Sequence, residues 1–205
     1  GLGELIALLG VFRLVNTLMI ALIWPNTEKF NQSIRDGSMD YTILQPVNSL
    51  FLVTFSRMTI WRIWDLALAI ILIVVGINMS GDTTTALSVL TFLLLTASGA
   101  FIIYSLWVVL IALTFWFTKF DNNVTILQAL LDSGRYPATV YPAWLRIIVT
   151  FVIPIAVATT IPLQALRGDL GTTQIVTFFV IGMLSFWVAS RVWKVGLKQY
   201  SGASS

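Results

Sequence analysis

The side chains that most often carry out enzyme chemistry are scarce in this sequence and lie far apart. Cysteine and histidine are absent, so there is no thiolate metal site and no imidazole to transfer protons near neutral pH. The nine carboxylates are scattered, mostly at loops and span ends, and only Asp65 is expected at membrane depth. The patterns G-x-x-x-x-G-K-[ST], H-E-x-x-H and G-x-S-x-G do not occur. The sequence therefore predicts a chain that is not an enzyme and binds no cofactor or metal of its own.

One short polar stretch, residues 33–48, stands between two long apolar runs and reads SIRDGSMDYTILQPVN. A short helix over residues 27–35 is expected to lie along the membrane surface before it. Gly37 is well suited to end that helix with a positive φ, and Pro46 interrupts the chain again. The pattern predicts a rigid helix–turn–helix. The alternative is an ordinary amphipathic loop anchored at the membrane surface.

A second group of polar residues is expected inside the membrane. Arg13 lies about 16 Å from the nearer end of its predicted helix, where a charge is costly unless it is paired or hydrated. Asp65 is the nearest candidate partner, and Asn16 lies one helical turn from Arg13. Arg62 precedes Asp65 by three residues and could neutralise it locally. The group is interpreted either as a structural ion pair or as part of the lining of a substrate pathway, where Arg13 would meet an anionic headgroup.

Three prolines break the region 143–171, one directly before it and two inside it: Pro142, Pro154 and Pro162. Proline removes a backbone donor, and the carbonyl groups it frees in a membrane need a partner or a water-filled cavity. A broken helix is therefore a candidate moving part. The alternative is a kink in a purely structural helix.

The overall composition sets the solvent in which these residues work. Hydrophobic residues make up 58% of the 205 residues, charged residues only 10%, and the mean hydropathy is +0.90. Soluble domains are nearer 45–50% apolar and about a quarter charged. A soluble fold of this composition could not cover its surface with polar groups, so the sequence predicts an all-α, polytopic membrane protein.

Five apolar runs are long enough to be considered as membrane spans. A single transmembrane domain over residues 1–200 is expected, in which Pro25 ends the first helix and residues 201–205 form a flexible tail. A preceding span would bring the number to six, because the chain begins without Met directly in an apolar run. The expected spans are 2–24, 51–78, 85–118, 143–161 and 173–190, with polar segments at 26–50 and 119–142.

The distribution of Lys and Arg predicts the orientation of the chain. Alternating crossings place ten of these residues on one side, at the polar segments, span ends and tail, and only Arg167 on the other. The polar stretch and the C-terminus are therefore expected in the cytoplasm. No clustered basic face is present, so a nucleic-acid partner is not expected.

Three sequence blocks resemble a known family. They are FRLVNTLMIALI, then IRDGSMDYTILQPVNSLF, and later GRYPATVYPAWLRIIVTFVIPIAVATTIPLQALRG. Together they are similar to the permease subunits of ABC-2 type exporters, in the branch of short six-span ABC-2 family transporter proteins. In that family an R-[DE]-G-x-[LM]-D stretch and a [KRQ]-P-V-[ND] stretch lie between the second and third spans.

The resemblance implies a transmembrane subunit of the bacterial plasma membrane that pairs with a second permease protomer, identical or sister. Separate cytoplasmic ATPase subunits would bind ATP and Mg²⁺ and drive export of an amphiphilic, lipid-like or drug-like substrate. A non-transporting membrane scaffold is the alternative. In the family the polar stretch is the coupling helix that seats in the ATPase, which here implicates Ile34, Arg35, Asp36, Gly37, Asp40, Gln45 and Pro46.

Overall fold

The structure, a computed structural model, describes residues 1–81, 84–116 and 155–200. This part of the chain is helical and contains no strand, which confirms the all-α prediction. The helices are α1 (Leu2–Arg35), α2 (Met39–Ile43), α3 (Ser49–Phe55), η1 (Ile60–Arg62), α4 (Ile63–Ser80), α5 (Ala86–Ala112), η2 (Leu113–Phe115), α8 (Ile155–Arg167) and α9 (Thr172–Gln199).

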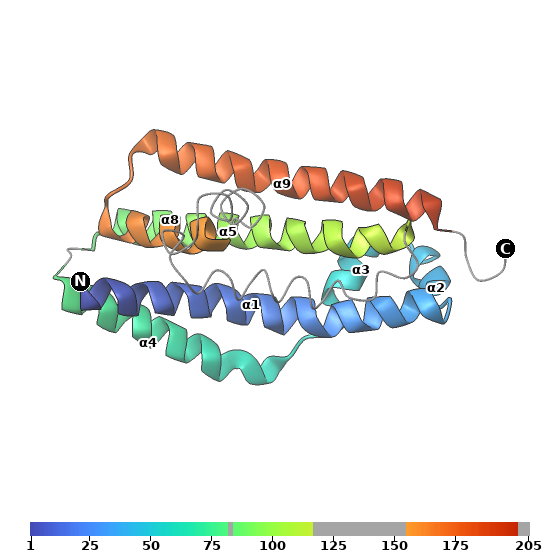
Figure 1. The fold of residues 1–205 in the computed structure, drawn as a ribbon, viewed down its shortest axis with the longest axis horizontal. Helices are drawn as coiled ribbons and strands as arrows, with labels where there is room; N and C mark the ends of the chain where they lie inside the picture. Colours follow the sequence, from blue (N-terminus) through green and yellow to red (C-terminus); the bar gives the residue numbers. More distant parts are fainter. Residues whose placement is uncertain (82–83, 117–154, 201–205) are drawn as a thin grey trace, which may run out of the picture.

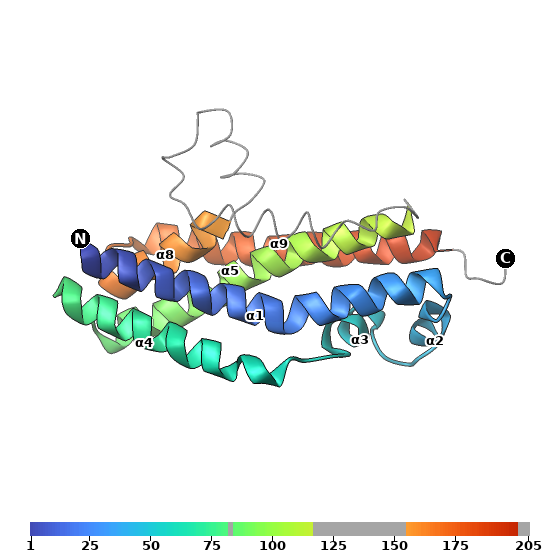
Figure 2. The same ribbon diagram turned by 60° about the horizontal axis from the view of Figure 1, so that its bottom comes forward.

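The long helices run lengthwise beside one another. Helix α5 packs between α1 and α9, and α4 lies along α1 on the side away from α9 (Figure 1). Helix α8 packs along α5 (Figure 2). The N-terminus, the end of α8 and the start of α9 meet at one end, the Arg167 end. The end of α1, α2 and the end of α9 meet at the opposite end, the Gly37 end.

Four helical segments within the described residues are long and apolar enough to cross a membrane. They are α1, α4, α5 extended through η2 to Phe115, and α9, and they confirm a polytopic helical membrane protein. The expected span 85–118 is one continuous helix up to η2, begun by Thr85, whose side chain accepts a hydrogen bond from the Ser88 amide. The expected segment 119–142, most of the span 143–161 and the tail 201–205 lie outside the described residues.

The first helix does not end at Pro25, as the sequence predicted, but continues for ten residues to Arg35. Proline leaves the carbonyl four residues earlier without its helical partner. Here the amide of Thr59 donates to that carbonyl, on Ala21, at 3.2 Å. The residues expected to form a separate surface helix are therefore the last turns of α1, which is about 51 Å long.

The expected second span, 51–78, is split into α3 and α4. Asn26, which follows Pro25 on α1, explains the break. Its side-chain amide is fully buried and donates to the carbonyl oxygens of Thr54 at 2.6 Å and Arg57 at 2.8 Å. The residues after α3 therefore bond to α1 instead of continuing their own helix, and the membrane-crossing part begins at Ile63.

Pro162, the third proline of the region predicted to be broken, does not break its helix. It lies inside α8, which continues to Arg167. The carbonyl four residues earlier belongs to Ala158, which packs directly against Gly99 on α5. Packing of this kind lets membrane helices accept proline without breaking. Pro142 and Pro154 lie outside the described residues.

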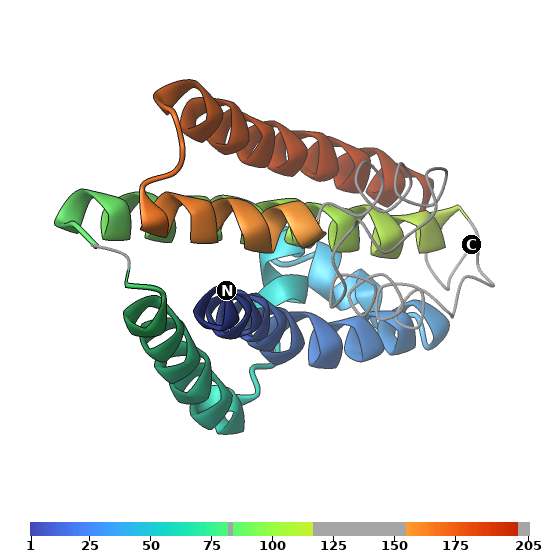
Figure 3. The same ribbon diagram turned by 60° about the vertical axis from the view of Figure 1, so that its left-hand side comes forward.

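Small residues bring the first turns of α1 into close contact with α4, near the N-terminus in Figure 3. A Cβ atom built on Gly76 of α4 would lie 2.4 Å from the amide nitrogen of Ala7 on α1. Gly3 and Gly10 on α1 meet the backbone of α4 in the same way. Small residues of this kind let membrane helices approach closely enough for extensive van der Waals contact.

Candidate functional site

The polar stretch predicted to be functional forms a turn followed by a short helix at the Gly37 end. We call residues 36–48, which connect α1 to α3, the knuckle segment. Gly37 has φ +74°, as the sequence predicted, and the amide of Asp36 closes α1 on the carbonyl of Gln32 at 3.0 Å. Helix α2 starts directly after Ser38. The left-handed glycine thus reverses the chain between two helices.

A carboxylate stiffens the turn. Asp36 accepts a hydrogen bond from the Ser38 amide at 2.9 Å. Hydrogen bonds from Ser38 hold the pKa of the Asp36 carboxyl below its ordinary value. Asp36 is therefore ionised at neutral pH, and it places a fixed negative charge on the exposed side of the turn.

Helix α2 is anchored to the bundle through Met39, whose side chain is fully buried. It joins a core cluster whose aromatic rings include Phe30 of α1, Phe115 of η2 and Trp193 of α9. The ring centroids of these three residues lie 5.2–5.7 Å apart. The knuckle segment is therefore packed against the ends of α1, α5 and α9 rather than hanging from the bundle.

Tyr200, at the end of α9, packs on the same cluster through Phe115, at 6.0 Å between ring centroids. Burial raises the pKa of the Tyr200 hydroxyl, and the neighbouring carboxylates of Asp40 and Asp36 act in the same direction. The hydroxyl is therefore neutral at physiological pH. Tyr200 therefore joins the end of α9 to the core cluster that also contains Met39 of the knuckle segment.

The three most exposed apolar side chains of the knuckle segment belong to Tyr41, Leu44 and Val47. Tyr41 is 75% exposed, Leu44 81% and Val47 48%. We call these three residues the knuckle apex. The sequence analysis did not single them out, although apolar residues in a segment expected outside the membrane were a usable signal. Of the residues it did select, Ile34 packs against the core, while Arg35, Gln45 and Pro46 are exposed and Asp40 is half-buried.

A polar groove of about 530 Å³ runs between the last turns of α1 and the segment from α2 to α3. Lys29 and Arg57 contribute positive charge to its lining, and Asp36 contributes negative charge. Gln45 also lines it. The knuckle segment therefore presents an apolar apex beside a groove of mixed charge.

The predicted intramembrane pair is present. The Arg13 guanidinium contacts Asp65 at 2.9 Å, and Arg62 contacts the other oxygen of the same carboxylate at 3.1 Å. Asp65 thus bridges α1 and the start of α4, which confirms the expected ion pair and its local neutralisation by Arg62. Asn16 is half-buried one turn further along α1. The substrate-facing role of Arg13, Asn16 and Asp65 stays a prediction.

The structural role of this pair predicts a non-additive response to mutation. Asp65→Asn should lower the thermal stability of the purified chain, because Arg13 and Arg62 lose their shared carboxylate, and Arg13→Gln should lower it less, because Asp65 keeps Arg62. The double variant should be at least as stable as the less stable of the two single variants. Thermal unfolding of all four proteins measures this directly. Fully additive losses would show that the contact contributes nothing to stability.

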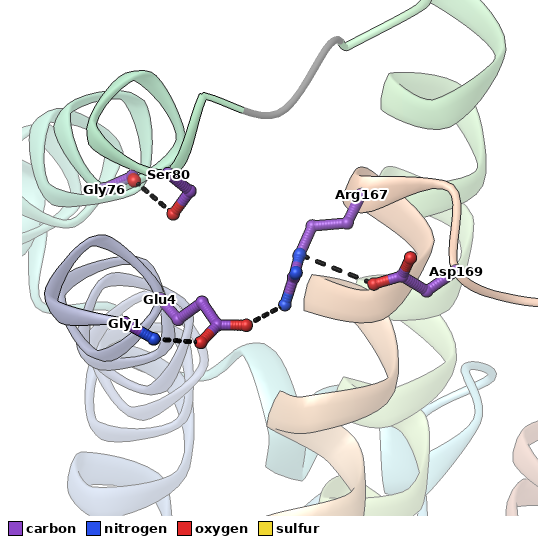
Figure 4. Close-up of polar contacts among 6 residues, drawn as sticks. All are labelled: Gly1, Glu4, Gly76, Ser80, Arg167 and Asp169. Carbon is purple, nitrogen blue, oxygen red and sulfur yellow. Dashed lines mark hydrogen bonds and ion pairs between the residues drawn. The ribbon is translucent and has the colours of Figure 1, made fainter.

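At the opposite end, an ion pair that sequence reasoning did not foresee links helices far apart in the chain. Figure 4 shows the guanidinium of Arg167, at the end of α8, directed at the carboxylate of Glu4 on α1. Arg167 also contacts Asp169 at 3.4 Å between Nε and the carboxylate. This network closes the Arg167 end. No pattern in the sequence pairs residues 163 positions apart.

The described residues contain no group of three His, Cys, Asp or Glu side chains that could hold a metal ion. A family model for ABC-2 family transporter proteins matches residues 1–204. The chain belongs to this family. No curated protein and no solved structure matches it. An ABC-2 family transporter with several membrane-crossing helices is a transmembrane permease, and in this permease the knuckle segment forms one end of the helical bundle.

Proposed function

We propose that this permease is the transmembrane subunit of an ATP-driven exporter in the bacterial plasma membrane, and that separate ATPase subunits dock on its knuckle segment. ATP and Mg²⁺ would bind to those subunits, since the chain itself has no P-loop. A second permease protomer, identical or sister, would complete the pathway for an amphiphilic, lipid-like or drug-like substrate. The permease would not be catalytic.

The arrangement of the knuckle segment is the observation that carries this proposal. Three exposed apolar side chains, those of the knuckle apex, are grouped at one end of the bundle, and grouped exposed apolar surface of this kind is typical of a protein interaction site. Met39 fixes the short helix of this segment, α2, to the core formed by α1, η2 and α9. A force applied at the apex would therefore reach the membrane helices, which is what energy coupling requires.

The charges at the two ends support a cytoplasmic Gly37 end. Lys29, Arg35, Lys194 and Lys198 lie in the last turns of α1 and α9 near this end. At the other end Arg167 is paired with Glu4 and Asp169. An excess of Lys and Arg at the membrane boundary is typical of the cytoplasmic side.

The docking proposal predicts a loss of energy coupling when the apex becomes charged. Leu44→Asp should reduce ATP hydrolysis by the reconstituted complex of this chain with a partner ABC ATPase by at least about tenfold, because a buried unpaired carboxylate weakens an apolar contact. The matched control is Val195→Asp. Val195 is also an exposed aliphatic residue, near the same end of α9.

The complex containing Val195→Asp should hydrolyse ATP as fast as the parent complex. Both variants should keep the melting temperature of the parent chain. Equal hydrolysis by the Leu44→Asp complex and the parent complex would refute docking at the apex. The alternative function is a non-transporting scaffold. A scaffold would bind the ATPase, but adding substrate would not change the rate at which the ATPase hydrolyses ATP.

The second proposed role concerns the intramembrane pair. If Arg13 meets an anionic substrate headgroup, Arg13→Lys should retain export and Arg13→Gln should lose it even where both fold. Equal export by both variants would leave the ion pair with a structural role only. The proposed moving part at Pro142 and Pro154 concerns residues outside the described ones, while Pro162 would act within α8 as a packed kink.

A further inference from the structure

A cavity of about 770 Å³ lies between α1, α3, α5 and α9, in the half of the bundle nearest the Gly37 end. It is distinct from the Arg13–Asp65 pair and shares only Val47 with the knuckle apex. Leu18 of α1, Phe101 of α5 and Phe186 of α9 are among its walls, and most of its lining is apolar. A space of this size accommodates a ligand rather than a few water molecules.

Three of the polar side chains on the walls, those of Thr54, Tyr104 and Trp193, are already bonded within the protein. The hydroxyl groups of Tyr104 and Thr54 share a hydrogen bond at 2.7 Å, and Thr54 also donates to the Leu50 carbonyl. The indole of Trp193 donates to Ser49 at 3.1 Å. These bonds leave few donors for a polar ligand, so the interior suits a hydrocarbon chain.

A cation stands at one edge of the cavity. Lys194 is the charged residue of its lining, it is exposed, and it forms no ion pair with the described residues. Arg191 and Lys198 lie on the same side of α9, and the Arg191 guanidinium stacks over Trp187 at 5.0 Å. An exposed tryptophan with nearby cations is typical of the membrane surface.

The position of Lys194 along α9 agrees with the thickness of a bilayer. It follows Thr172, the first residue of α9, by about 33 Å at 1.5 Å per residue, close to the roughly 30 Å of hydrocarbon in a membrane. An apolar cavity that opens beside a cation at this depth matches a lipid whose chain is buried and whose headgroup is anionic.

We infer that this cavity binds an acyl chain of an anionic membrane phospholipid, with its phosphate group held by Lys194. The apolar walls bind the acyl chain of the lipid, and Lys194 favours a headgroup with a net negative charge. Phosphatidylcholine offers the same chains without a net charge, so the two halves of the site can be tested separately.

The test is lipid retention by the purified chain, measured by native mass spectrometry after exchange into equimolar phosphatidylglycerol and phosphatidylcholine with identical acyl chains. The parent chain should prefer phosphatidylglycerol. Lys194→Gln should reduce phosphatidylglycerol retention about five- to tenfold and abolish the preference, since one charge-assisted phosphate contact is lost. Lys198→Gln, one turn further along α9 and outside the cavity, is the matched control and should retain the preference.

Filling the cavity tests its apolar half. Ala97→Phe and Ala100→Phe place rings into the space from α5 and should reduce retention of both lipids to a similar extent. Two positions are used so that misfolding of one variant leaves the other informative. Unchanged retention in both, or an equal loss in Lys198→Gln and Lys194→Gln, would overturn the inference in favour of diffuse surface attraction. The measurement uses no ATPase, so its outcome is independent of the docking proposal.

Discussion

Asn26→Leu is expected to destabilise the permease by about 3 to 5 kcal/mol. The side chain of Asn26 is fully buried and acts both as donor and as acceptor. It donates to the carbonyl groups of Thr54 and Arg57, and its oxygen accepts from the Ser56 hydroxyl at 2.7 Å and the Arg57 amide at 2.8 Å. Leucine has a similar volume but leaves these groups unpaired, and each buried unpaired group costs about 1 to 3 kcal/mol.

The measurement is equilibrium unfolding of the purified chain in detergent, with Asn78→Leu as the matched control. Asn78 is exposed on α4, and its amide donates only to the Val74 carbonyl one turn earlier, at 2.9 Å. Its replacement should change the unfolding free energy by less than about 1 kcal/mol. Similar losses in the two variants would show that Asn26 does not fasten α3 and the start of α4 to α1.

A second large effect is expected at the closest helix contact. Gly76→Ala should destabilise the chain by about 2 to 3 kcal/mol, although alanine favours helix formation. Its Cβ would lie 2.4 Å from the Ala7 nitrogen and 2.7 Å from the Gly3 carbonyl oxygen. Both contacts are with backbone, which cannot rotate away as a side chain can, so α1 and α4 must move apart.

Gly171→Ala is the control for this substitution. Gly171 precedes α9 with φ −74°, and the nearest atom to a Cβ built there is the Gln174 side-chain oxygen at 3.8 Å. The control should lose less than about 1 kcal/mol in the same unfolding measurement. If Gly76→Ala were as stable as its parent, the close α1–α4 contact would not describe the folded protein.

The features that could be predicted from the sequence are those governed by local rules. Gly37 follows a helix that ends in a polar turn, and a glycine there is the usual residue for positive φ. Arg13 and Asp65 could be paired because a charge inside a membrane requires a partner and few acids were available. The membrane-crossing helices followed from long apolar runs.

The features that could not be predicted depend on partners distant in the chain. Pro25 has a strong local tendency to end a helix, but the Thr59 amide supplies the donor that the Ala21 carbonyl loses. Asn26 gave no signal of its own, since its five hydrogen bonds appear only once α3 packs beside α1. The pairing of Glu4 with Arg167 likewise depends on the arrangement of α1 and α8.

The knuckle segment illustrates both cases. Its turn was predicted, but its division into a buried anchor and an exposed apex was not, because Met39 and Leu44 are both apolar and only packing distinguishes them. The anchor connects the segment to α1, η2 and α9, and the apex remains available to a partner. This division is the physical basis of the proposed coupling between an ATPase and the membrane helices.

Docking of the ATPase on the knuckle apex is tested most directly by site-specific cross-linking. The chain has no cysteine, so a single introduced thiol reports one position only. Leu44→Cys carrying a short photoreactive group should cross-link to an ABC ATPase that forms a complex with this chain, while Val195→Cys, modified in the same way, should not. Equal cross-linking from both positions, or none from Leu44→Cys in a complex that still hydrolyses ATP in response to substrate, would contradict the proposed docking.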